Sequence, residues 1–458
     1  MTDSVAFIPM NPPADGKLPS FQIVETNTAS YEQPDNEEYN PFENRRVRKA
    51  TSSAGTLIHL IKSSLGTGIL AMPLAFKNGG LVFGILGTAL VAAIYAHCVH
   101  LLVSTSQKSC KRNKIPSLGF SETAQTVCAN GPPSARKFAA FAKAYIDYML
   151  LIMSFFSVSV YLVFISTTLR DVINYELQIE WETRTYILMT TIIVALITQV
   201  RELKYLVPFS LLANSSILVV FIITLYYIFK DPVNLEDRNL WPEWTNLPSF
   251  FGIAVYAIEG IGIVLPVENK MKHPQHFLHP VGVVNLGICF ISILYVITGF
   301  FGYALYGPKT KGSVTLNLPN EEILAKSTQL LAALAILLTT GLYYYVPMEI
   351  LWLKIGHKVP ASRESLAQIL IRLGIVVVMM GFALTVPELE LFIGFVGSIG
   401  SATLALLTPI TLDTIYRWPT DFGWMQWRLV KNVILGLFGG FILVVGTYFS
   451  VQDIIENI

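Results

Sequence analysis

Two short stretches carry residues whose types and order suit the binding of a small charged molecule. GTGILAMP runs from Gly66 to Pro73 and GIGIVLP from Gly260 to Pro266, each with two glycines, an isoleucine, apolar residues and a proline. Gly and Pro weaken a helix interior by about 1 and about 3 kcal/mol per residue, so they interrupt the helices that contain them. The resulting half-helix ends expose N–H groups, which suit a carboxylate, and carbonyl groups, which suit an ammonium. Together the stretches indicate a site for a small zwitterion, such as an α-amino acid.

The same stretches have an alternative interpretation, because small residues also let membrane helices pack closely. One copy alone would favour packing. Two copies in matching positions favour a binding site, because paired Gly and Pro interruptions mark the substrate site of transporters built from repeats.

Three ionisable side chains lie beside these stretches, and such groups at membrane depth are functional candidates. His59 and Lys62 precede the first stretch, and Glu259 comes directly before the second. Imidazole groups gain and lose protons between about pH 5 and 8, so we predict that His59 couples protons to transport. Glu259 is the second proton-coupling candidate. Pairing with His59 or Lys62 and capping of the broken helix are alternative roles for it.

Other residues give weaker indications of chemistry. One hydroxyl of the stretch YYY, residues 343–345, is expected to face the site, and Thr339 and Thr340 are candidate sodium ligands. HPQHFLH, residues 273–279, has three histidines without cysteines or paired carboxylates, which favours a solvated linker. The sequence has no phosphate-binding loop, nucleophile elbow or zinc-protease helix. We therefore predict no enzyme activity, no cofactor and no metal site.

Two pairs of charged residues have the spacing of structural ion pairs. Lys143 and Asp147 are four residues apart, and Glu349 lies near Lys354. Residues four apart are neighbours on one helix face. We predict that these pairs stabilise their helices rather than bind substrate.

The helices that hold these residues must lie in a membrane. The chain has 458 residues, of which 53% are hydrophobic and 14% charged, and its mean hydropathy is +0.54. Soluble domains average about 25% charged residues. The composition predicts an all-α integral membrane protein with the lipid bilayer as its surroundings, and no basic patch indicates nucleic acid.

Eleven apolar runs are candidates for membrane-spanning helices, since about 20 apolar residues cross a bilayer. They are residues 53–76, 79–103, 140–169, 184–200, 206–229, 247–268, 281–306, 326–354, 367–387, 391–413 and 432–452. Residues 1–50 are polar and lack the apolar segment of a signal peptide, which predicts a disordered N-terminal tail before a transporter domain at 51–452.

The interrupted stretches fall in spans one and six, which predicts two five-helix repeats of inverted orientation. Repeat one covers about residues 53–229 and repeat two about 247–413, followed by an extra helix at 432–452 and a short tail at 453–458. More than two thirds of the 32 Lys and Arg residues fall on the side of the N-terminal tail. This bias predicts a cytosolic N-terminus, and eleven crossings then place the C-terminus outside the cell or in a lumen.

Four blocks of the sequence resemble a known family. YNPFENRR, LIHLIKSSLGTGILAMPLAFKNGG, IEGIGIVLPVENKMK and KGSVTLNLP are similar to blocks of the proton-coupled amino-acid transporters of the amino acid/auxin permease superfamily, and most similar to insect members. The resemblance covers about residues 40–450. It implies a LeuT-like five-plus-five inverted repeat with an eleventh helix and proton symport of small neutral amino acids. By position it implies that His59 couples protons and that residues 66–68 and 259–262 form the two breaks.

These observations together predict a secondary active transporter that carries small neutral amino acids, such as alanine, glycine and proline, with protons by alternating access. The alternatives are a sodium-coupled transporter and an amino-acid sensor with little flux that signals to growth control. The candidate substrate-binding residues are Ser64, Gly66, Thr67, Gly68, Tyr256, Gly260, Gly262 and Tyr344.

The expected location is the plasma membrane or a late endosome or lysosome. YNPF, residues 39–42, has the form of a tyrosine-type sorting signal and of an NPF endocytic motif. We therefore predict endocytic sorting adaptors as partners of the N-terminal tail.

Overall fold

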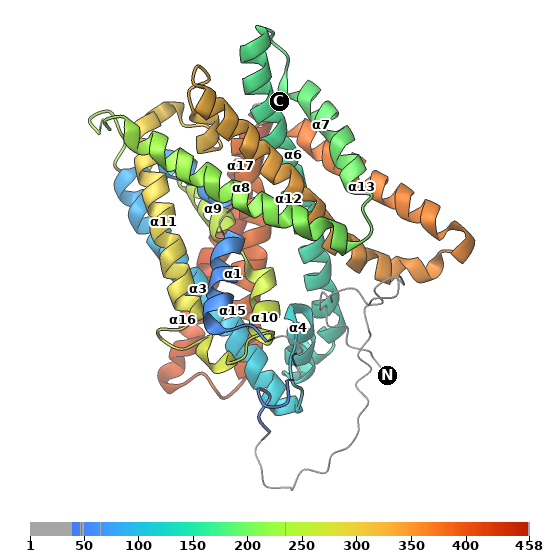
Figure 1. Ribbon diagram of the computed structural model, residues 1–458. Helices are drawn as coiled ribbons and strands as arrows, with labels where there is room; N and C mark the ends of the chain where they lie inside the picture. The colour runs from blue at the N-terminus through green and yellow to red at the C-terminus, as the bar shows by residue number, and fades with distance from the viewer. Residues whose placement is uncertain (1–38, 46, 48–49, 65, 234, 457–458) are drawn as a thin grey trace.

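The structure, a computed structural model, describes residues 39–45, 47, 50–64, 66–233 and 235–456 (Figure 1). Most of the predicted disordered tail therefore lies outside the described residues. The α-helices are α1 Ser53–Ser64, α2 Thr67–Gly79, α3 Leu81–Asn113, α4 Phe120–Ala129, α5 Pro133–Arg136, α6 Ala139–Leu177, α7 Thr183–Ile197, α8 Leu203–Lys230, α9 Leu247–Ile258, α10 Ile261–Asn269, α11 Val283–Tyr306, α12 Ile323–Ile355, α13 Glu364–Thr385, α14 Leu389–Val396, α15 Thr408–Arg417, α16 Trp427–Phe441 and α17 Thr447–Glu456. The π-helical segments η6 Gly397–Leu407 and η8 Ile442–Gly446 join α14 to α15 and α16 to α17.

Nine helical stretches among the described residues are long and apolar enough to cross a membrane, or ten if α1 and α2 form one bent span. α7 has 15 residues. At 1.5 Å per residue it is about 22 Å long, short of a hydrocarbon core of about 30 Å. The predicted all-α membrane fold is confirmed, whereas the count of eleven crossings stays a prediction that depends on α7.

A buried arginine caps the C-terminal end of the short α7. Arg372 of α13 is 2% exposed, and its Nη1 donates hydrogen bonds to the carbonyl oxygens of Thr198 and Val200 at 2.7 and 3.2 Å. The last carbonyls of a helix have no partners within it. Because the guanidinium supplies donors, α7 can end within the packed helices without leaving these carbonyls unpaired.

The charged pairs predicted from helical spacing are not the ones that form. Asp147 of α6 pairs with Lys354 of α12, with Oδ2 and Nζ 3.1 Å apart, rather than with Lys143. Glu349 lies 3.6 Å from Nη2 of Arg372 rather than beside Lys354. Packing between helices, which spacing along one helix does not reveal, selects these partners.

Two spans are broken where the glycine-rich stretches predict it. α1 and α2 are bent by 55° relative to each other, and α2 begins directly after Gly66. α9 ends at Ile258 and α10 begins at Ile261, so Glu259 and Gly260 stand outside regular helix. The prediction of broken helices one and six is confirmed.

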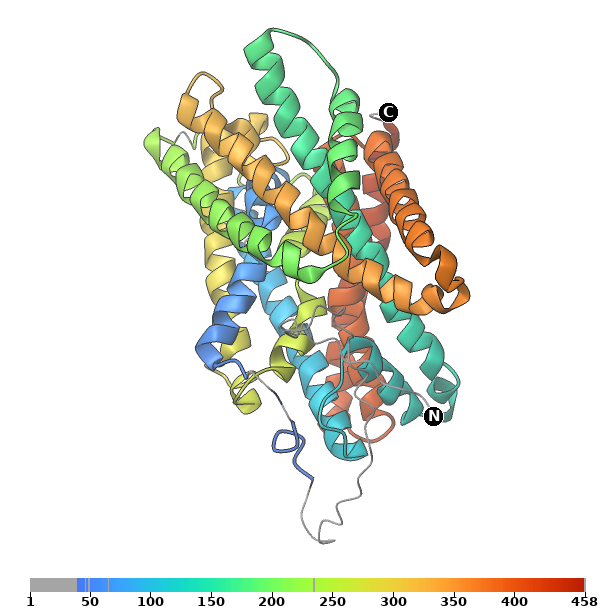
Figure 2. The same ribbon diagram turned by 45° about the vertical axis from the view of Figure 1, so that its right-hand side comes forward.

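The helices pack in two main groups, and both broken spans belong to the same group. In the first group α2 packs on α9 and α11, α1 packs on α11, and α3 packs on α11. In the second, α12 packs on α6 and α8, while α7 and α13 pack on α6. Figures 1 and 2 show α8 and α12 side by side, crossing the molecule obliquely. A movement of the first group against the second would therefore carry both breaks together.

The stretch from α14 through η6 to α15 is the most buried of the spans, with 78% of its apolar window inside the protein. It packs on α9 through α14 and η6. π-helical turns inside α-helices are frequent at functional sites. η6 carries Ser401, which reaches the second break.

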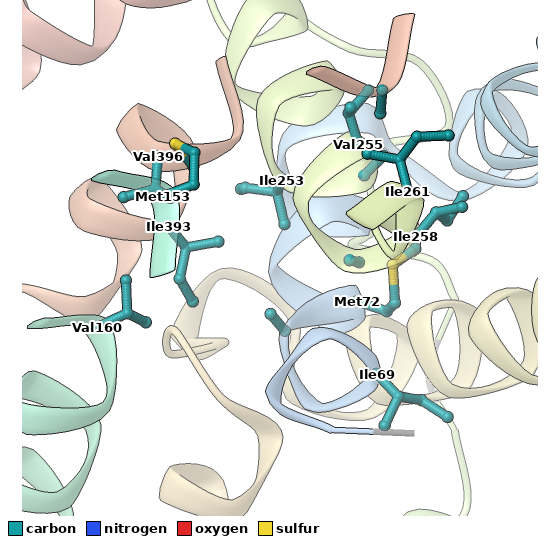
Figure 3. Close-up of a cluster of buried hydrophobic side chains, with 14 of the residues drawn as sticks. Ile69, Met72, Met153, Val160, Ile253, Val255, Ile258, Ile261, Ile393 and Val396 are labelled. Carbon is teal, nitrogen blue, oxygen red and sulfur yellow. The ribbon is translucent and has the colours of Figure 1, made fainter. Parts of the chain in front are cut away.

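Apolar side chains from several helices surround the breaks (Figure 3). The residues labelled there lie on α2, α6, α9, α10 and α14: Ile69, Met72, Met153, Val160, Ile253, Val255, Ile258, Ile261, Ile393 and Val396. On the outer faces, by contrast, large apolar side chains such as Leu196 and Ile192 are 71% and 66% exposed. An apolar outer surface on long apolar helices fits lipid, so the chain is an integral, multi-pass membrane protein.

Candidate substrate site

The first break offers backbone groups to a ligand. α1 ends at Ser64, and the N–H groups of the first turn of α2, from Thr67 onward, have no partners within their helix. A Cβ atom at Gly66 would have no heavy atom of the described residues within 4 Å. Open space therefore lies beside the positive N-terminal end of α2, where an anion is favoured.

The second break has the same arrangement. Glu259 and Gly260 separate α9 from α10, whose first N–H groups begin at Ile261. A Cβ atom at Gly260 would meet only the hydroxyl oxygen of Tyr95 among the described atoms, at 3.6 Å. A Cβ at Gly262 would lie 3.2 Å from the Leu150 side chain of α6, so this glycine adjoins the second group of helices.

The two breaks lie against each other. A Cβ atom at Gly68 would lie 2.7 Å from the carbonyl oxygen of Ala257, so α2 touches the backbone of α9 here. The hydroxyl groups of Thr67 and Tyr256 are 3.3 Å apart and share a hydrogen bond. Gly68 thus serves close packing, the alternative that the sequence pattern allowed, while Gly66 borders open space.

A hydroxyl from a third helix joins the two breaks. The Tyr295 Oη of α11 lies 2.6 Å from the carbonyl oxygen of Ser64 and 2.7 Å from that of Ala257. Tyr295 is fully buried. The ends of α1 and α9 are therefore held at one point.

A small cavity, partly open to its surroundings, lies beside the breaks. Its polar lining consists of the hydroxyls of Ser63, Ser64, Tyr95 and Ser292 and of backbone, and no charged side chain is among the described residues that line it. The other lining residues are small or apolar: Leu60, Ala92, Val99, Ile258, Gly260, Val264, Phe277, Val284, Gly287, Ile288 and Ile291. Such a cavity suits a small ligand with polar ends and an uncharged side chain.

The two proton-coupling candidates occupy different surroundings. The half-buried Glu259 accepts a hydrogen bond from the Ser401 hydroxyl of η6. His59 is exposed on α1 and, within the part of the chain that the structure describes, has no hydrogen bond or ion pair. Glu259 is therefore not paired with His59 or Lys62 in this conformation.

The structure does not bring Tyr344 to the breaks. Its hydroxyl donates to the carbonyl oxygen of Arg372 at 2.7 Å, and its ring lies 5.7 Å from that of Phe155. Adjacent residues on a helix point about 100° apart, so Tyr343 faces another way, with its ring 5.4 Å from that of Tyr161. The expectation of a substrate contact from Tyr344 is corrected by this orientation.

The candidate sodium ligands also bond within their own helix. The hydroxyls of Thr339 and Thr340 donate to the carbonyl oxygens of Ala335 and Ile336, both at 2.8 Å. Sequence reasoning missed Tyr95, Tyr295 and Ser401, each of which reaches a break from a different span. Tyr95 and Tyr295 stand in long apolar runs and Ser401 in the small-residue stretch GSIGSAT, and no local pattern marks any of them as a site residue.

Ion pairs fasten the broken spans at their two far ends. In the last turn of α10, Glu268 forms a buried pair with Arg45, with Oε1 and Nη1 3.0 Å apart and side chains 1% and 4% exposed. At the far end of α2, the Lys77 Nζ lies 3.6 Å from Glu390 of α14 and donates to the carbonyl oxygen of Thr310 at 3.0 Å. Each broken span is thus tied to a different part of the chain at its outer end.

The sequence and the fold are similar to those of known proteins. The profile of a family described as transmembrane amino acid transporter protein matches residues 49–452. The "Proton-coupled amino acid transporter-like protein pathetic" of Drosophila melanogaster is 36% identical over 444 residues, which cover 97% of this chain and 94% of that protein. The "Probable amino acid transporter skat-1" of Caenorhabditis elegans is 25% identical over 88% of this chain and 90% of its own length. The solved structure titled "Inward facing conformation of Mhp1" is similar with a TM-score of 0.52 at 13% identity, covering 92% of this chain and 94% of that one, which shows the LeuT-like fold.

Proposed function

The chain belongs to the family of transmembrane amino acid transporter proteins, and from this premise we propose that it carries small neutral amino acids together with protons. The family resemblance of the four sequence blocks is confirmed. The chain is therefore a transporter and not an enzyme. We propose its substrate class, its coupling ion and the roles of its residues.

The observation that carries the proposal is the meeting of two broken helices at one cavity. The substrate carboxylate binds the free N–H groups at the start of α2, beside Gly66, where the helix dipole favours negative charge. The ammonium binds the carbonyl oxygens at the ends of α1 and α9, those of Ser64 and Ala257. The remaining candidates, Thr67, Tyr256, Gly260 and Gly262, shape the space between these points.

The cavity supports a substrate with a small, uncharged side chain. Its described lining is apolar apart from hydroxyls and backbone, so a charged side chain would be buried without a partner. Burying an unpaired charge is far more costly than burying a methyl group. Alanine, glycine and proline fit this description better than aspartate or arginine.

Two groups beside the breaks support coupling to protons. His59 is exposed on α1, seven residues or about two turns before Gly66, and Glu259 stands in the second break with Ser401 as its hydrogen-bond donor. Imidazole and carboxylate groups can both bind a proton, and the Drosophila relative is named as proton-coupled. We assign proton loading to His59 or Glu259.

Alternating access is supported by the arrangement of the two helix groups. Both breaks belong to the helix group of α2, α9 and α11, so this group carries the substrate when it rocks against the group of α6, α8 and α12. Opening on the side of α2 separates Lys77 of α2 from Glu390 of α14. The Arg45–Glu268 pair instead joins the segment before α1 to α10, so it moves together with the group that holds the breaks.

The N-terminal segment supports a role in sorting as well. In the described turn, Asn40 Oδ1 accepts a hydrogen bond from the N–H of Phe42 at 3.1 Å, and the Arg45 guanidinium lies 5.1 Å from the centre of the Phe42 ring. We propose that this YNPF turn is the contact for endocytic adaptors, in a chain that resides in the plasma membrane or in late endosomes and lysosomes.

Competition for uptake tests the substrate class. In this experiment, the uptake of labelled alanine by cells that express the chain is measured in the presence of excess unlabelled glycine, proline, aspartate or arginine. We expect glycine and proline to reduce uptake and the two charged amino acids to leave it unchanged. Equal competition by aspartate or arginine would contradict the proposed substrate class, and an absence of uptake would favour the sensor.

A further inference from the structure

The position of one tyrosine suggests a role that the substrate site alone does not explain. The Tyr295 hydroxyl lies at 2.6 and 2.7 Å from two carbonyl oxygens, those of Ser64 and Ala257. Ser64 is the last residue of α1, and Ala257 lies in the last turn of α9. Both carbonyls are therefore at helix ends, where they have no partner within their own helix.

A phenol hydroxyl has one hydrogen atom to donate. Of the two short contacts, only one can be a full hydrogen bond at any time. The Ser64 carbonyl also accepts a hydrogen bond from the N–H of Gly66 at 3.0 Å, so the Ala257 carbonyl is the one left without a donor when the hydroxyl points to Ser64. An ammonium group carries three N–H donors and forms N–H···O bonds of about 2.7–2.9 Å to such acceptors. The point that the hydroxyl occupies is thus one at which a substrate amino group would satisfy both carbonyls better.

We propose that the Tyr295 hydroxyl takes the place of the substrate's amino group while the transporter is empty. This inference rests on the proposed function, in which the carbonyls of Ser64 and Ala257 receive the ammonium. When substrate enters, its N–H groups take over these acceptors and the hydroxyl moves aside or accepts a bond itself. When substrate leaves, the hydroxyl returns.

The consequence concerns the step in which the empty transporter changes conformation. Without substrate and without this hydroxyl, the movement would bury the Ala257 carbonyl unpaired and leave the Ser64 carbonyl with the N–H of Gly66 as its donor, and an unpaired buried acceptor is unfavourable. The loaded transporter keeps its carbonyls satisfied by substrate and does not need the hydroxyl. Net uptake requires the empty return step, whereas exchange of internal for external substrate does not.

The test uses Tyr295→Phe, which removes only the hydroxyl and keeps the buried ring. Tyr303→Phe is the matched control, because Tyr303 lies on the same helix, is 3% exposed and uses its hydroxyl to accept a hydrogen bond from the N–H of Asn239. Purified full-length protein is placed in proteoliposomes. Net uptake of labelled alanine into empty vesicles and exchange into alanine-loaded vesicles are then measured for each variant.

We expect Tyr295→Phe to lower net uptake about tenfold relative to exchange, because the empty return step then lacks one hydrogen bond to a buried acceptor. The KM for alanine in exchange should fall, because the substrate no longer competes with the hydroxyl. Tyr303→Phe should keep the wild-type ratio of exchange to net uptake. This ratio does not depend on how much protein is inserted, so a variant that is made poorly still gives an answer.

Two results would overturn the inference. Equal losses of net uptake and exchange in Tyr295→Phe would show a structural role, and unchanged rates with an unchanged KM would show that the hydroxyl is not needed. Failure of the proposed function is distinct from both, because wild-type vesicles would then show neither net uptake nor exchange of alanine.

Discussion

At the scale of single residues, the two proton-coupling candidates differ in what surrounds them. Glu259 has a fixed donor in Ser401, whereas His59 is exposed on α1 and free of hydrogen bonds and ion pairs to the described residues. His59 can take up a proton without first losing a hydrogen bond to another described residue, whereas Glu259 is bonded to Ser401. We therefore propose His59 as the first proton acceptor.

Replacing His59 tests this assignment. We expect His59→Ala to reach the membrane and to lose the increase in alanine uptake on acidification, because the group that binds the proton is gone. Uptake is compared at about pH 5.5 and about pH 7.4 in cells with equal surface levels of the two proteins. His357→Ala, an exposed histidine in the turn after α12, is the control and should keep the acid stimulation. A normal pH response in His59→Ala would remove His59 from the mechanism and leave Glu259.

The two glycines at the first break make a second residue-scale prediction. Gly68→Ala places a Cβ against the backbone of Ala257, and overpacking of this kind costs about 1–3 kcal/mol. Gly66→Ala meets open space, so its folding free energy should change by less than about 0.5 kcal/mol while its KM for substrate rises. Thermal unfolding in detergent and concentration-dependent uptake measure the two effects. Equal destabilisation by both substitutions would mean that Gly66 is also a packing residue.

Part of the site could be predicted from single residues, and part could not. Gly66 and Gly260 interrupt apolar runs, and an interruption is visible along the chain whatever packs around it. Tyr95, Tyr295 and Ser401 reach the breaks only because distant helices pack there, and no local pattern in the sequence carries a sign of this. Tyr344 shows the converse error, because three adjacent tyrosines point in different directions and the sequence does not say which one faces inward.

At the scale of elements, the segment before α1 is fastened to the end of α10. The N–H of Thr51 donates to the carbonyl oxygen of Lys270 at 2.8 Å, and that of Lys272 donates to the carbonyl oxygen of Thr51 at 2.9 Å. The Arg45–Glu268 pair lies beside this connection, and Gln107 of α3 donates to the same carboxylate at 2.8 Å. The end of the second broken span is therefore held by two separate stretches of chain, the segment before α1 and α3.

Removal of one partner of this pair should destabilise the protein. Arg45→Ala leaves the Glu268 carboxylate buried without its cation, for which we expect a loss of about 3–5 kcal/mol in folding free energy. Adding Glu268→Gln should recover part of that loss, because the unpaired charge is then removed. Lys230→Ala is the control, since the Lys230–Glu322 pair is exposed and its removal should leave the folding free energy almost unchanged. Additive effects of Arg45→Ala and Glu268→Gln would show that the two side chains do not interact.

The boundaries of most helices could be predicted from hydropathy, because a bilayer requires long apolar helices, and the two breaks could be predicted from Gly and Pro. The ion pairs between helices could not be predicted from the sequence. Asp147 and Glu349 each have a partner on another helix, and the helical spacing that suggested Lys143 and Lys354 describes one helix at a time. α7 ends at Ile197, three residues before the end of the predicted span at 184–200, and the capping of the Thr198 carbonyl by Arg372 depends on a distant helix that the sequence pattern does not show.

At the scale of the whole molecule, the number of crossings decides on which sides the two ends of the chain lie. α1 begins beside α10, and the chain ends after α17 at the opposite end of the helix bundle (Figure 1). Eleven crossings put the termini on opposite sides of the membrane, whereas a chain in which α7 does not cross would have them on the same side. The excess of Lys and Arg favours a cytosolic N-terminus.

Epitope tags at the two termini test this topology. We expect an antibody to reach the C-terminal tag on intact cells, or on the lumenal side of isolated organelles, and the N-terminal tag only after permeabilisation. A tag in the segment between α5 and α6 is the internal control, because it should follow the N-terminal tag. Labelling of both termini from one side would show ten crossings and would exclude α7 from the membrane spans.

The central claim is that this chain moves small neutral amino acids with protons, and uptake measured against pH and sodium tests it most directly. Labelled alanine, glycine and proline are offered to expressing cells at about pH 5.5 and about pH 7.4, with and without sodium. We predict uptake that rises at the acidic pH and is indifferent to sodium. Uptake that requires sodium and ignores pH would contradict proton coupling, and an absence of uptake in cells with the protein at the surface would contradict transport itself.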